Sequence, residues 1–251
     1  NHTEPDHSGT LAALIELAPK ATVFGSKIAL SYLAEIMNKP FNSCVVKDGD
    51  IISLGNKTLQ IINAPNLHWP DSIYTYLQED KVLFTCDSFG AHFCDEKMFD
   101  DLVEKTSYNK AFKYYFDVIL RPYSSFMVKA IEKIKPLAID VICPGHGPVL
   151  RSGWKDVVEK SEQLSNEYLE KTCNCENNIL ITYVSAYGYT KQMAEDIAEG
   201  IKSVKTCNVE LLDIENIMLG ELESKLVVSN AIIVGSPTIN KNTLLPVYRL
   251  F

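Results

Sequence analysis

Histidines and carboxylates crowd residues 2–7 of this chain and recur at His68, Asp87 and His146, each of which follows an apolar, strand-like run and enters a turn. Four of the five histidines belong to this set. Side chains used only for packing or solubility would not fall so regularly at strand ends, so the pattern predicts that distant segments meet at a metal site. The predicted ligands are His2, Glu4, Asp6, His7, His68, Asp87 and His146.

The chemistry of this set suits two cations. Imidazoles and carboxylates supply enough nitrogen and oxygen donors for both if one carboxylate bridges, and Asp87 lies between the other ligand segments in the sequence. In a turn, His2, Glu4 and Asp6 would point to one side, and His7 would reach a second cation. The chain has no His-Glu-x-x-His motif, so loops rather than a helix are expected to build the site. Any one of the histidines, taken alone, is equally well explained as a structural side chain.

Composition narrows the class of protein. A net charge of −8 on 251 residues argues against a general nucleic-acid binder, because no basic stripe is present to release phosphate counterions. The sequence has no apolar run of membrane-spanning length.

Seven cysteines form no dense, even-numbered framework, so we expect reduced thiols and a cytoplasmic protein. Cys173 and Cys175 are interpreted as linker cysteines, with metal binding or a strained redox pair as alternatives.

Hydrophobic periodicity divides the chain into two α/β domains, residues 1–175 and 176–251, joined by a polar linker at residues 172–178. In the first domain it predicts hairpins and buried strands that deliver His68, Asp87 and His146. Helices are expected at residues 8–18 (capped by Ser8), 27–37, 124–135 and 154–171, and strands at residues 21–25, 51–54, 59–62, 72–77, 82–86 and 139–143.

The second domain has a βαβ pattern. Strands are expected at residues 179–184, 209–212 and 232–234, with a helix at 191–202, which is typical of a doubly wound parallel sheet. The turn Ser185-Ala186-Tyr187-Gly188-Tyr189-Thr190 is neither a Walker A loop nor a Gly-x-Gly-x-x-Gly motif. Its hydroxyls and free backbone N–H groups at a helix start suit a phosphate, although an ordinary helix cap has the same composition.

The ligand pattern resembles the flavodiiron proteins, which are A-type flavoproteins of the rubredoxin:oxygen/nitric oxide oxidoreductase family. The similarity rests on His-x-Glu-x-Asp-His at residues 2–7, followed by Ser8-Gly9 and the separate His68, Asp87 and His146. It implies a metallo-β-lactamase-like αββα sandwich for the metal domain. Hydrolytic relatives of that fold usually carry His where this chain has Glu4, and a carboxylate there moves the preference from zinc toward iron or manganese.

The second half resembles flavodoxin in its flavodiiron form, because Ser-x-Tyr-Gly-x-Thr is followed by Gly235-Ser236-Pro237-Thr238-Ile239-Asn240. The resemblance implies that residues 185–190 hold the FMN phosphate and residues 236–240 hold its ring. It covers almost the whole chain, but upstream strands of the metal domain and the last strands of the flavodoxin-like sheet are absent. With a metal ligand at its second residue, the sequence is therefore expected to be a fragment lacking both termini.

The resemblance also implies a redox function. FMN would receive electrons from an external carrier such as rubredoxin or its reductase and pass them to two irons, which would reduce dioxygen to water, nitric oxide to nitrous oxide, or both. His2, Glu4 and His68 would ligate one iron, Asp6, His7 and His146 the other, and Asp87 would bridge. Members of the family are usually head-to-tail homodimers or dimers of dimers.

Several alternatives stay open. His92 either acts as a catalytic hydrogen-bond donor over the metals or only lies in its loop, and the aromatic segment 89–123 either covers the metals or packs as core. A binuclear zinc hydrolase of the metallo-β-lactamase superfamily would explain the ligands but not the FMN-type loops or Glu4. A non-catalytic electron carrier would explain the second domain but not the placed histidines. The sequence does not distinguish dioxygen from nitric oxide as the substrate.

Overall fold

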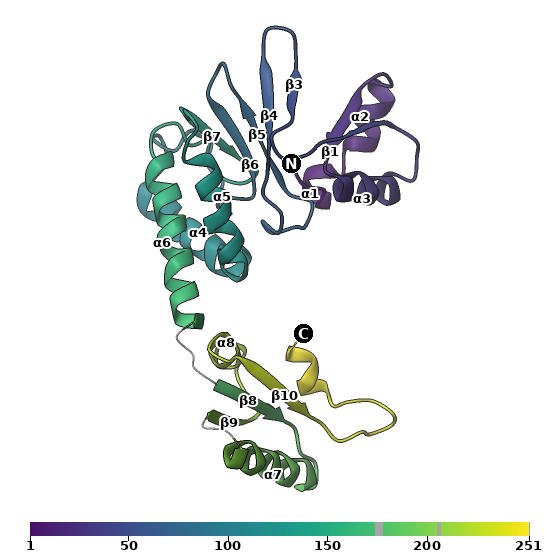
Figure 1. The fold of residues 1–251 in the computed structure, drawn as a ribbon, viewed down its shortest axis with the longest axis vertical. Coiled ribbons are helices and arrows are strands. Elements are labelled where there is room, and N and C mark those ends of the chain that lie inside the picture. Colours follow the sequence, from purple (N-terminus) through teal and green to yellow (C-terminus); the bar gives the residue numbers. More distant parts are fainter. Residues whose placement is uncertain (174–177, 205–206, 251) are drawn as a thin grey trace. The chain divides into compact units, whose positions relative to one another are not determined.

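The computed structural model describes residues 1–173, 178–204 and 207–250, without the side chains of Thr172 and Cys173. The chain divides into two compact units, Asn1–Glu167 and Tyr168–Phe251 (Figure 1). Residues 174–177 of the expected linker at 172–178, with Cys175, and the side chain of Cys173 lie outside the described residues. Within the described part of the chain, no helix combines the length and apolar character needed to cross a membrane.

A five-stranded mixed sheet forms the centre of the first unit. Its strands follow one another in chain order, antiparallel from β3 to β6 and parallel between β6 and β7. A separate two-stranded parallel sheet pairs β1 with β2. The strands are β1 Thr22–Gly25, β2 Asn42–Val45, β3 Ile51–Ser53, β4 Thr58–Asn63, β5 Ile73–Leu77, β6 Val82–Cys86 and β7 Val141–Pro144.

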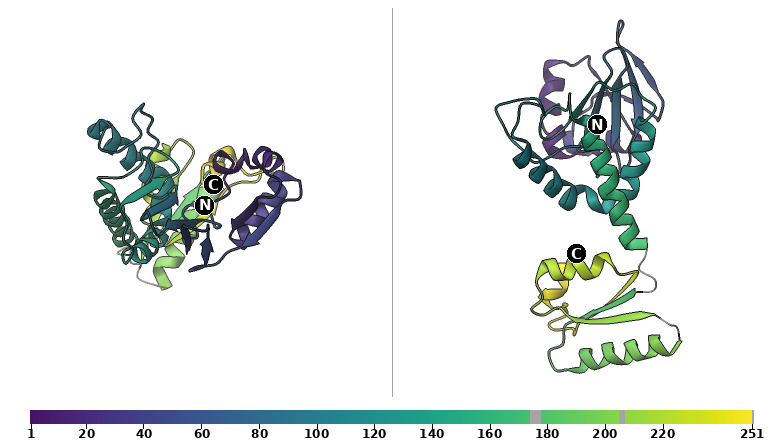
Figure 2. Two further views of the ribbon diagram at one scale, coloured as in Figure 1. Left: turned by 90° about the horizontal axis from the view of Figure 1, so that it is seen from above. Right: turned by 90° about the vertical axis from the view of Figure 1, so that its left-hand side faces the viewer.

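Helices lie on both sides of these sheets. Helices α4, α5 and α6 lie on one side of the five-stranded sheet, and the β1–β2 sheet with α2 and α3 lies on the other (Figures 1 and 2). This is the expected αββα layering. The helices are α1 Pro5–Ser8, α2 Leu11–Leu17, α3 Lys27–Met37, α4 Lys105–Tyr115, α5 Ser124–Ile134 and α6 Trp154–Cys173, with a π-helix at Phe116–Leu120 and a 3-10 helix at Arg121–Tyr123 between α4 and α5.

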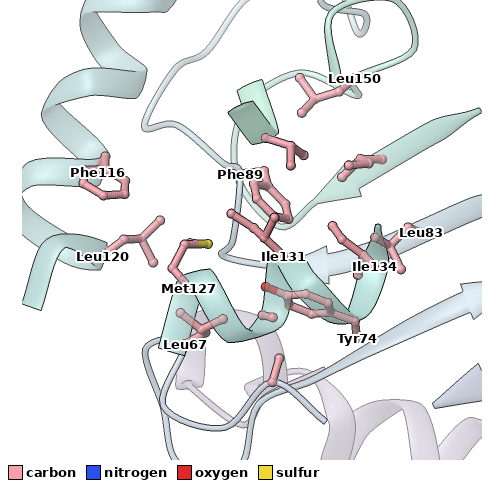
Figure 3. Close-up of a cluster of buried hydrophobic side chains, with 14 of the residues drawn as sticks. Leu67, Tyr74, Leu83, Phe89, Phe116, Leu120, Met127, Ile131, Ile134 and Leu150 are labelled. Atoms are coloured by element: carbon pink, nitrogen blue, oxygen red, sulfur yellow. The ribbon is translucent and has the colours of Figure 1, made fainter. Parts of the chain in front are cut away.

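The main hydrophobic core lies between the five-stranded sheet and helices α4 to α6. Helix α5 buries Met127, Ile131 and Ile134, spaced three or four residues apart, against Tyr74 and Leu83 of the sheet (Figure 3). Each such side chain contributes roughly 1.5–3 kcal/mol of transfer free energy when it is buried. This packed layer holds the strand ends, and hence the loops that follow them, in fixed positions.

The second unit is a three-stranded parallel sheet in the order β10-β8-β9. Its elements are β8 Asn178–Tyr183, α7 Tyr189–Val204, β9 Asn208–Asp213, α8 Leu219–Val227, β10 Ala231–Gly235 and a 3-10 helix at Leu245–Leu250. One face packs Ile181 against Ala194 of α7, and the other packs Val184 against Leu222 of α8. The predicted doubly wound arrangement is therefore confirmed for the described strands.

Most predicted elements are confirmed within one or two residues, but the start of the chain differs. The predicted helix at residues 8–18 is confirmed at Leu11–Leu17 but begins later than expected, because Pro5–Ser8 form a separate short helix and Gly9 and Thr10 lie between the two. Ser8 does not cap the second helix. Its hydroxyl instead donates to the carbonyl oxygens of Thr3 and Glu4, at 2.9 and 3.1 Å, and so closes the ligand-bearing turn on itself.

Candidate metal centre

The predicted metal ligands come together at one end of the five-stranded sheet. Asp87 follows β6 directly, His146 follows β7 after one glycine, and His68 lies in the loop between β4 and β5. The N-terminal ligand segment reaches the same edge because the side-chain amide of Asn1 donates to the carbonyl of Ile73 at 2.8 Å. All seven residues that the sequence predicts as ligands are therefore neighbours in the structure.

The Asp87 carboxylate lies between two groups of donor atoms. Its Oδ2 is 2.9 Å from Nε2 of His68 and 3.8 Å from Nε2 of His2. Its Oδ1 is 2.9 Å from Nε2 of His7 and 3.5 Å from Nε2 of His146. Each oxygen faces a different pair of imidazoles, which is the arrangement a carboxylate needs to join two cations.

Glu4 completes the first donor group. Its Oε2 lies 3.0 Å from Nε2 of His68 and 3.5 Å from Nε2 of His2. Two ligands bound to one cation at about 2.0–2.2 Å stand about 3.0–3.4 Å apart, so this spacing fits a cation among the three side chains. Glu4, His2 and His68 therefore form, with Asp87, a set of four donors able to hold one metal ion.

Asp6 completes the second group. Its Oδ2 is 3.3 Å from Nε2 of His146, and its Oδ1 is 3.6 Å from Nε2 of His7. The expectation that Asp6 points to the same side as His2 and Glu4 is wrong. Glu4 has an extended backbone and precedes helix α1, whereas Asp6 lies in the helix, so the two-residue alternation of an extended chain does not continue from Glu4 to Asp6.

The protonation state of His2 suits a metal ligand. The Ser72 hydroxyl donates to the carbonyl of Leu67 at 2.8 Å, so its oxygen accepts from Nδ1–H of His2 at 3.1 Å. This assigns the proton to Nδ1 and leaves the lone pair on Nε2. Nε2 is buried and has no hydrogen-bond partner among the described atoms. Burial lowers the pKa of His2 to about 4, so the ring is neutral at pH 7 and its free nitrogen faces the donor group.

A second buried contact fixes the segment that carries the first ligands. The backbone N–H and the hydroxyl of Thr3 donate to Oδ2 of Asp71 at 2.9 and 2.8 Å. Asp71 is 1% exposed and Thr3 is 4% exposed, so this contact is shielded from water. Asp71 and Ser72 are adjacent, and together they hold residues 2 and 3 against the loop that carries His68.

Asp87 is ionised in this environment. Burial alone would raise the pKa of its carboxyl, but the hydrogen bond with His68 and the nearby imidazoles of His2, His7 and His146 outweigh it and lower the pKa to about 2. Burial disfavours the charged form of His68, yet its hydrogen bond with Asp87 and the charges of Asp87 and Glu4 raise its pKa overall. The anionic Asp87 thus provides the central negative charge of the centre.

Aromatic side chains border the second donor group. The Tyr115 ring lies edge-on to the ring of His92 at 4.6 Å between centroids and 6.0 Å from that of His146. Tyr115 is 1% exposed and its hydroxyl has no hydrogen-bond partner among the described atoms. Burial, and then the charge of Asp87, raise its pKa, so the phenol keeps its proton. His92 is exposed and its ring is 5.3 Å from that of His146, so its catalytic role stays a prediction.

The first predicted FMN loop joins β8 to α7 in the second unit. Its backbone turns at Gly188, where φ is +85°, and α7 begins at the next residue. The Ser185 hydroxyl accepts from the backbone N–H of Lys191 at 3.2 Å, as a helix-capping side chain does. Tyr187 and Tyr189 are 84% and 79% exposed. The loop therefore combines capped helix geometry with uncovered aromatic and backbone groups.

The second predicted FMN loop follows β10, the strand beside β8. Ile239 and Asn242 exchange two backbone hydrogen bonds of 3.0 Å, and Asn240 and Lys241 between them have φ of +53° and +64°. These positive values form a tight type I′ turn. A Cβ added at Gly235 would lie 3.1 Å from Cγ2 of Thr190, so the end of β10 lies close to the start of α7. Both loops follow the carboxyl ends of the adjacent strands β8 and β10, where the strand order reverses because β9 and β10 lie on opposite sides of β8, and this is the usual ligand position in such sheets.

Sequence reasoning missed the residues that support the centre. Asp71 and Ser72 contact Thr3 and His2, which lie some seventy residues earlier, and no local pattern marks such a pairing. Tyr115 is one of many aromatic residues in its segment, and only its contacts with the rings of His92 and His146 set it apart. A Pro-Asp-Ser run directly after His68-Trp69 was the only available signal for the first two.

Known proteins match both the metal-ligand half and the flavodoxin-like half of the chain. The family described as ODP family beta lactamase matches residues 1–147. The flavo-diiron protein FprA2 of Clostridium acetobutylicum is 43% identical over 256 residues, which covers 100% of this chain and 63% of that protein. The type A flavoprotein fprA of Rhodobacter capsulatus is 37% identical over 253 residues, covering 100% of this chain and 58% of that one. The chain thus spans about three fifths of these relatives.

Solved structures give the same result. The rubredoxin oxygen:oxidoreductase of Desulfovibrio gigas has a TM-score of 0.63 and 31% identity, over 98% of this chain and 61% of that one. The metal-soaked Flv1 flavodiiron core of Synechocystis has a TM-score of 0.66 and 29% identity, over 99% and 61%. With its metallo-β-lactamase-like first unit and flavodoxin-like second unit, the chain belongs to the flavodiiron protein family.

Proposed function

We propose that this chain carries the diiron and FMN sites of an oxidoreductase that reduces dioxygen to water, nitric oxide to nitrous oxide, or both. Electrons would come from an external carrier such as rubredoxin or its reductase. Family membership supports the activity, and a relative from Desulfovibrio gigas is titled a rubredoxin oxygen:oxidoreductase. The observation that carries the proposal is the position of Asp87, whose two oxygens face separate groups of imidazoles.

The ligands divide between two irons according to the donor groups. His2, Glu4 and His68 would hold one iron, Asp6, His7 and His146 the other, and Asp87 would bridge. The pairing of hard carboxylates with imidazoles favours iron over zinc, because zinc prefers softer nitrogen and sulfur donors. The unpaired Nε2 of His2 supports this assignment, since a buried lone pair without a partner is costly unless a ligand takes it.

When bound, the irons and the flavin supply the electrons for reducing a diatomic substrate. The protein's own residues position and shield that chemistry. Ser72 and Asp71 keep His2 and Thr3 in place, and Asp87 holds the centre's negative charge. Tyr115 keeps a proton on a buried oxygen beside His146, where it can donate a hydrogen bond to a small polar ligand. His92 would lie beside the same position as a catalytic donor.

FMN would bind at the two predicted loops of the second unit. Residues 185–190 would hold the phosphate through backbone N–H groups at the start of α7, and residues 236–240 would contact the ring. We further propose a cytoplasmic, head-to-tail homodimer, or a dimer of two such dimers, in which the FMN of one copy serves the irons of the other. Ligands and flavin loops belong to separate units, and this pairing would bring them within electron-transfer reach.

Metal and flavin content test the proposal directly. The full-length protein, purified without oxygen and without added metal, should contain about two irons and one FMN per chain. Its reduced form should consume dioxygen or nitric oxide, and the ratio of the two rates gives the substrate preference. Asp87→Asn should lose iron and turnover, while the exposed Asp140→Asn, in the loop before β7, should retain both. Two zincs without flavin would contradict the redox function and favour hydrolysis, and bound flavin without turnover would favour an electron carrier.

A further inference from the structure

Cys86 lies beside His2, His7 and Asp87 of the metal centre, although it belongs to neither donor group of the proposed iron pair. It ends β6, directly before Asp87, and is 6% exposed. In a regular strand two consecutive side chains point to opposite faces. Here the pairing of β6 with β7 shifts between Phe84 and Cys86, and Cys86 has a left-handed φ of +51°. This break in the strand brings the thiol and the neighbouring carboxylate to the same group of imidazoles.

The result is a third possible set of metal ligands. Donor atoms of His2, His7, Cys86 and Asp87 all lie within 4.8 Å of one another. Four ligands around a zinc ion, with bonds of about 2.0–2.1 Å to nitrogen and about 2.3 Å to sulfur, stand about 3.3–3.6 Å apart. Small side-chain movements would therefore bring these four atoms to tetrahedral spacing.

A second observation shows that this set is open to a ligand. Nε2 of His2 carries a free lone pair, because Nδ1 holds the ring proton, and it has no hydrogen-bond partner among the described atoms. His2 is 4% exposed. This nitrogen lies 3.8 Å from Oδ2 of Asp87, which belongs to the same set of donors as the thiol of Cys86. This set of four residues thus includes a neutral imidazole, that of His2, with a nitrogen free to bind a cation, in addition to the Cys86 thiol.

We propose that His2, His7, Cys86 and Asp87 form an alternative, mononuclear site for a single thiophilic divalent cation such as Zn²⁺. This proposal rests on the proposed function in one respect: the site shares His2, His7 and Asp87 with the iron pair. Glu4, Asp6, His68 and His146 take no part in it. As the sulfur–metal bond forms, the thiol proton leaves to solvent, and no oxidation or reduction occurs.

The single-cation site and the iron pair have opposite metal preferences because their donor atoms differ. Two imidazoles, one thiolate and one carboxylate match the tetrahedral, nitrogen- and sulfur-rich coordination that zinc favours. The iron pair instead uses three carboxylates and no sulfur. Because zinc also binds most sites more tightly than ferrous iron, the thiolate should let one zinc ion exclude both irons. Cys86 therefore makes the centre sensitive to the ratio of zinc to iron.

Cobalt titration tests the proposal, because Co²⁺ adopts zinc geometry and a cobalt–thiolate bond absorbs in the near ultraviolet. Full-length protein freed of metal by a chelator is titrated with Co²⁺. The sulfur-to-cobalt band should appear and saturate at one equivalent per chain. Cys86→Ser should lose the band, and its zinc affinity should fall at least roughly tenfold, the lower bound for removing even an outer-shell partner. Cys143→Ser, on the neighbouring strand β7, should behave like the unaltered protein.

A missing band in the unaltered protein, or a band that persists in Cys86→Ser, would overturn the proposal. Iron loading separates this result from the proposed function. Cys86→Ser should still take up about two irons per chain, since serine removes no ligand of the iron pair. If the unaltered protein takes up no iron, the proposed function fails, while the cobalt band still decides whether Cys86 is a ligand. A misfolded variant is recognised by its lost flavin and altered circular dichroism, and Cys86→Ala then provides the second substitution.

Discussion

Gly145 stands so close to His7 that a side chain between them has no room. A Cβ placed on Gly145 would lie 2.7 Å from Cε1 of His7 and 3.4 Å from Oδ1 of Asp87. Heavy atoms in ordinary contact are about 3.5–4.0 Å apart, so the imidazole would have to move. The glycine before His146 is thus required by packing against another predicted ligand.

Gly145→Ala should displace His7 and weaken the second donor group more than the first. We expect iron content of the purified protein to fall from about two per chain toward one, with a fall in turnover of at least about tenfold. Metal analysis and Mössbauer spectroscopy measure this. Gly200→Ala, in helix α7 where an added Cβ meets nothing within 4 Å, is the matched control and should leave iron content unchanged. Full iron content in Gly145→Ala would show that His7 does not hold metal.

Ser72→Ala should weaken metal binding through His2. The substitution removes the oxygen that accepts from Nδ1–H, so the proton is free to move to Nε2 and block the lone pair. We expect the affinity for the first iron to fall roughly 10- to 100-fold, as measured by competition with a chelator. Ser31→Ala, on the exposed face of α3, should have no effect. Equal affinities in the two variants would mean that Ser72 does not set the His2 tautomer.

Tyr115→Phe should reduce turnover without destabilising the protein. The hydroxyl is buried near the Asp87 carboxylate without a close hydrogen-bond partner among the described atoms, so its removal should change the fold little, whereas a bound substrate would lose a donor. We expect turnover to fall about tenfold, the scale of one hydrogen bond of about 1–1.5 kcal/mol, with unchanged iron content and melting temperature.

Tyr108→Phe gives the matched comparison, because the Tyr108 hydroxyl is also buried without a partner among the described atoms but Tyr108 packs on Phe93 and Phe112. Its turnover should equal that of the unaltered protein. Parallel losses in both variants would point to a general effect on the aromatic layer.

Acid should loosen helix α4 through its N-cap. Hydrogen bonds from the backbone N–H groups of Ser107 and Thr106 lower the pKa of Glu104 from 4.5 to about 2. Because the folded-state pKa is below the unfolded one, this carboxylate stabilises the fold above about pH 4.5, and the contribution is lost as pH falls toward 2. Thermal melts of Glu104→Gln should therefore depend less on pH in this window. The exposed Glu35→Gln on α3 should follow the unaltered protein, and an unchanged pH dependence in Glu104→Gln would contradict the capping role.

The sequence predicted the fold well where a side chain's position follows from local periodicity. Such cases are strand β6 before Asp87, strand β7 before His146, and the amphipathic helix α5. Strand β2, Asn42–Val45, was not predicted, because all four residues are exposed and show no alternation, and only pairing with β1 makes it a strand.

The clustering of the predicted ligands could be inferred from the sequence, but the geometry of the cluster could not. Donor types and strand ends indicated that these seven side chains would lie together, which the structure shows, whereas the residues alone did not give their division into two groups, which depends on the helical turn at Pro5–Ser8. Tyr115 ends the regular helix α4, and only its tertiary contacts with His92 and His146 place it beside the second donor group. The contact between Thr3 and Asp71 joins residues with no relation in sequence.

The distance along the chain between the donors has a consequence for folding. The centre joins residues 2–7 to residues 68, 87 and 146, so bound cations tie three long loops closed at a single point. A metal pair held in this way acts as a crosslink that opposes unfolding, since binding free energy becomes folding free energy. Removal of iron should therefore release the ligand-bearing segment first and expose its peptide bonds to proteases before the sheet itself opens. Metal occupancy would then decide the lifetime of the protein as well as its chemistry.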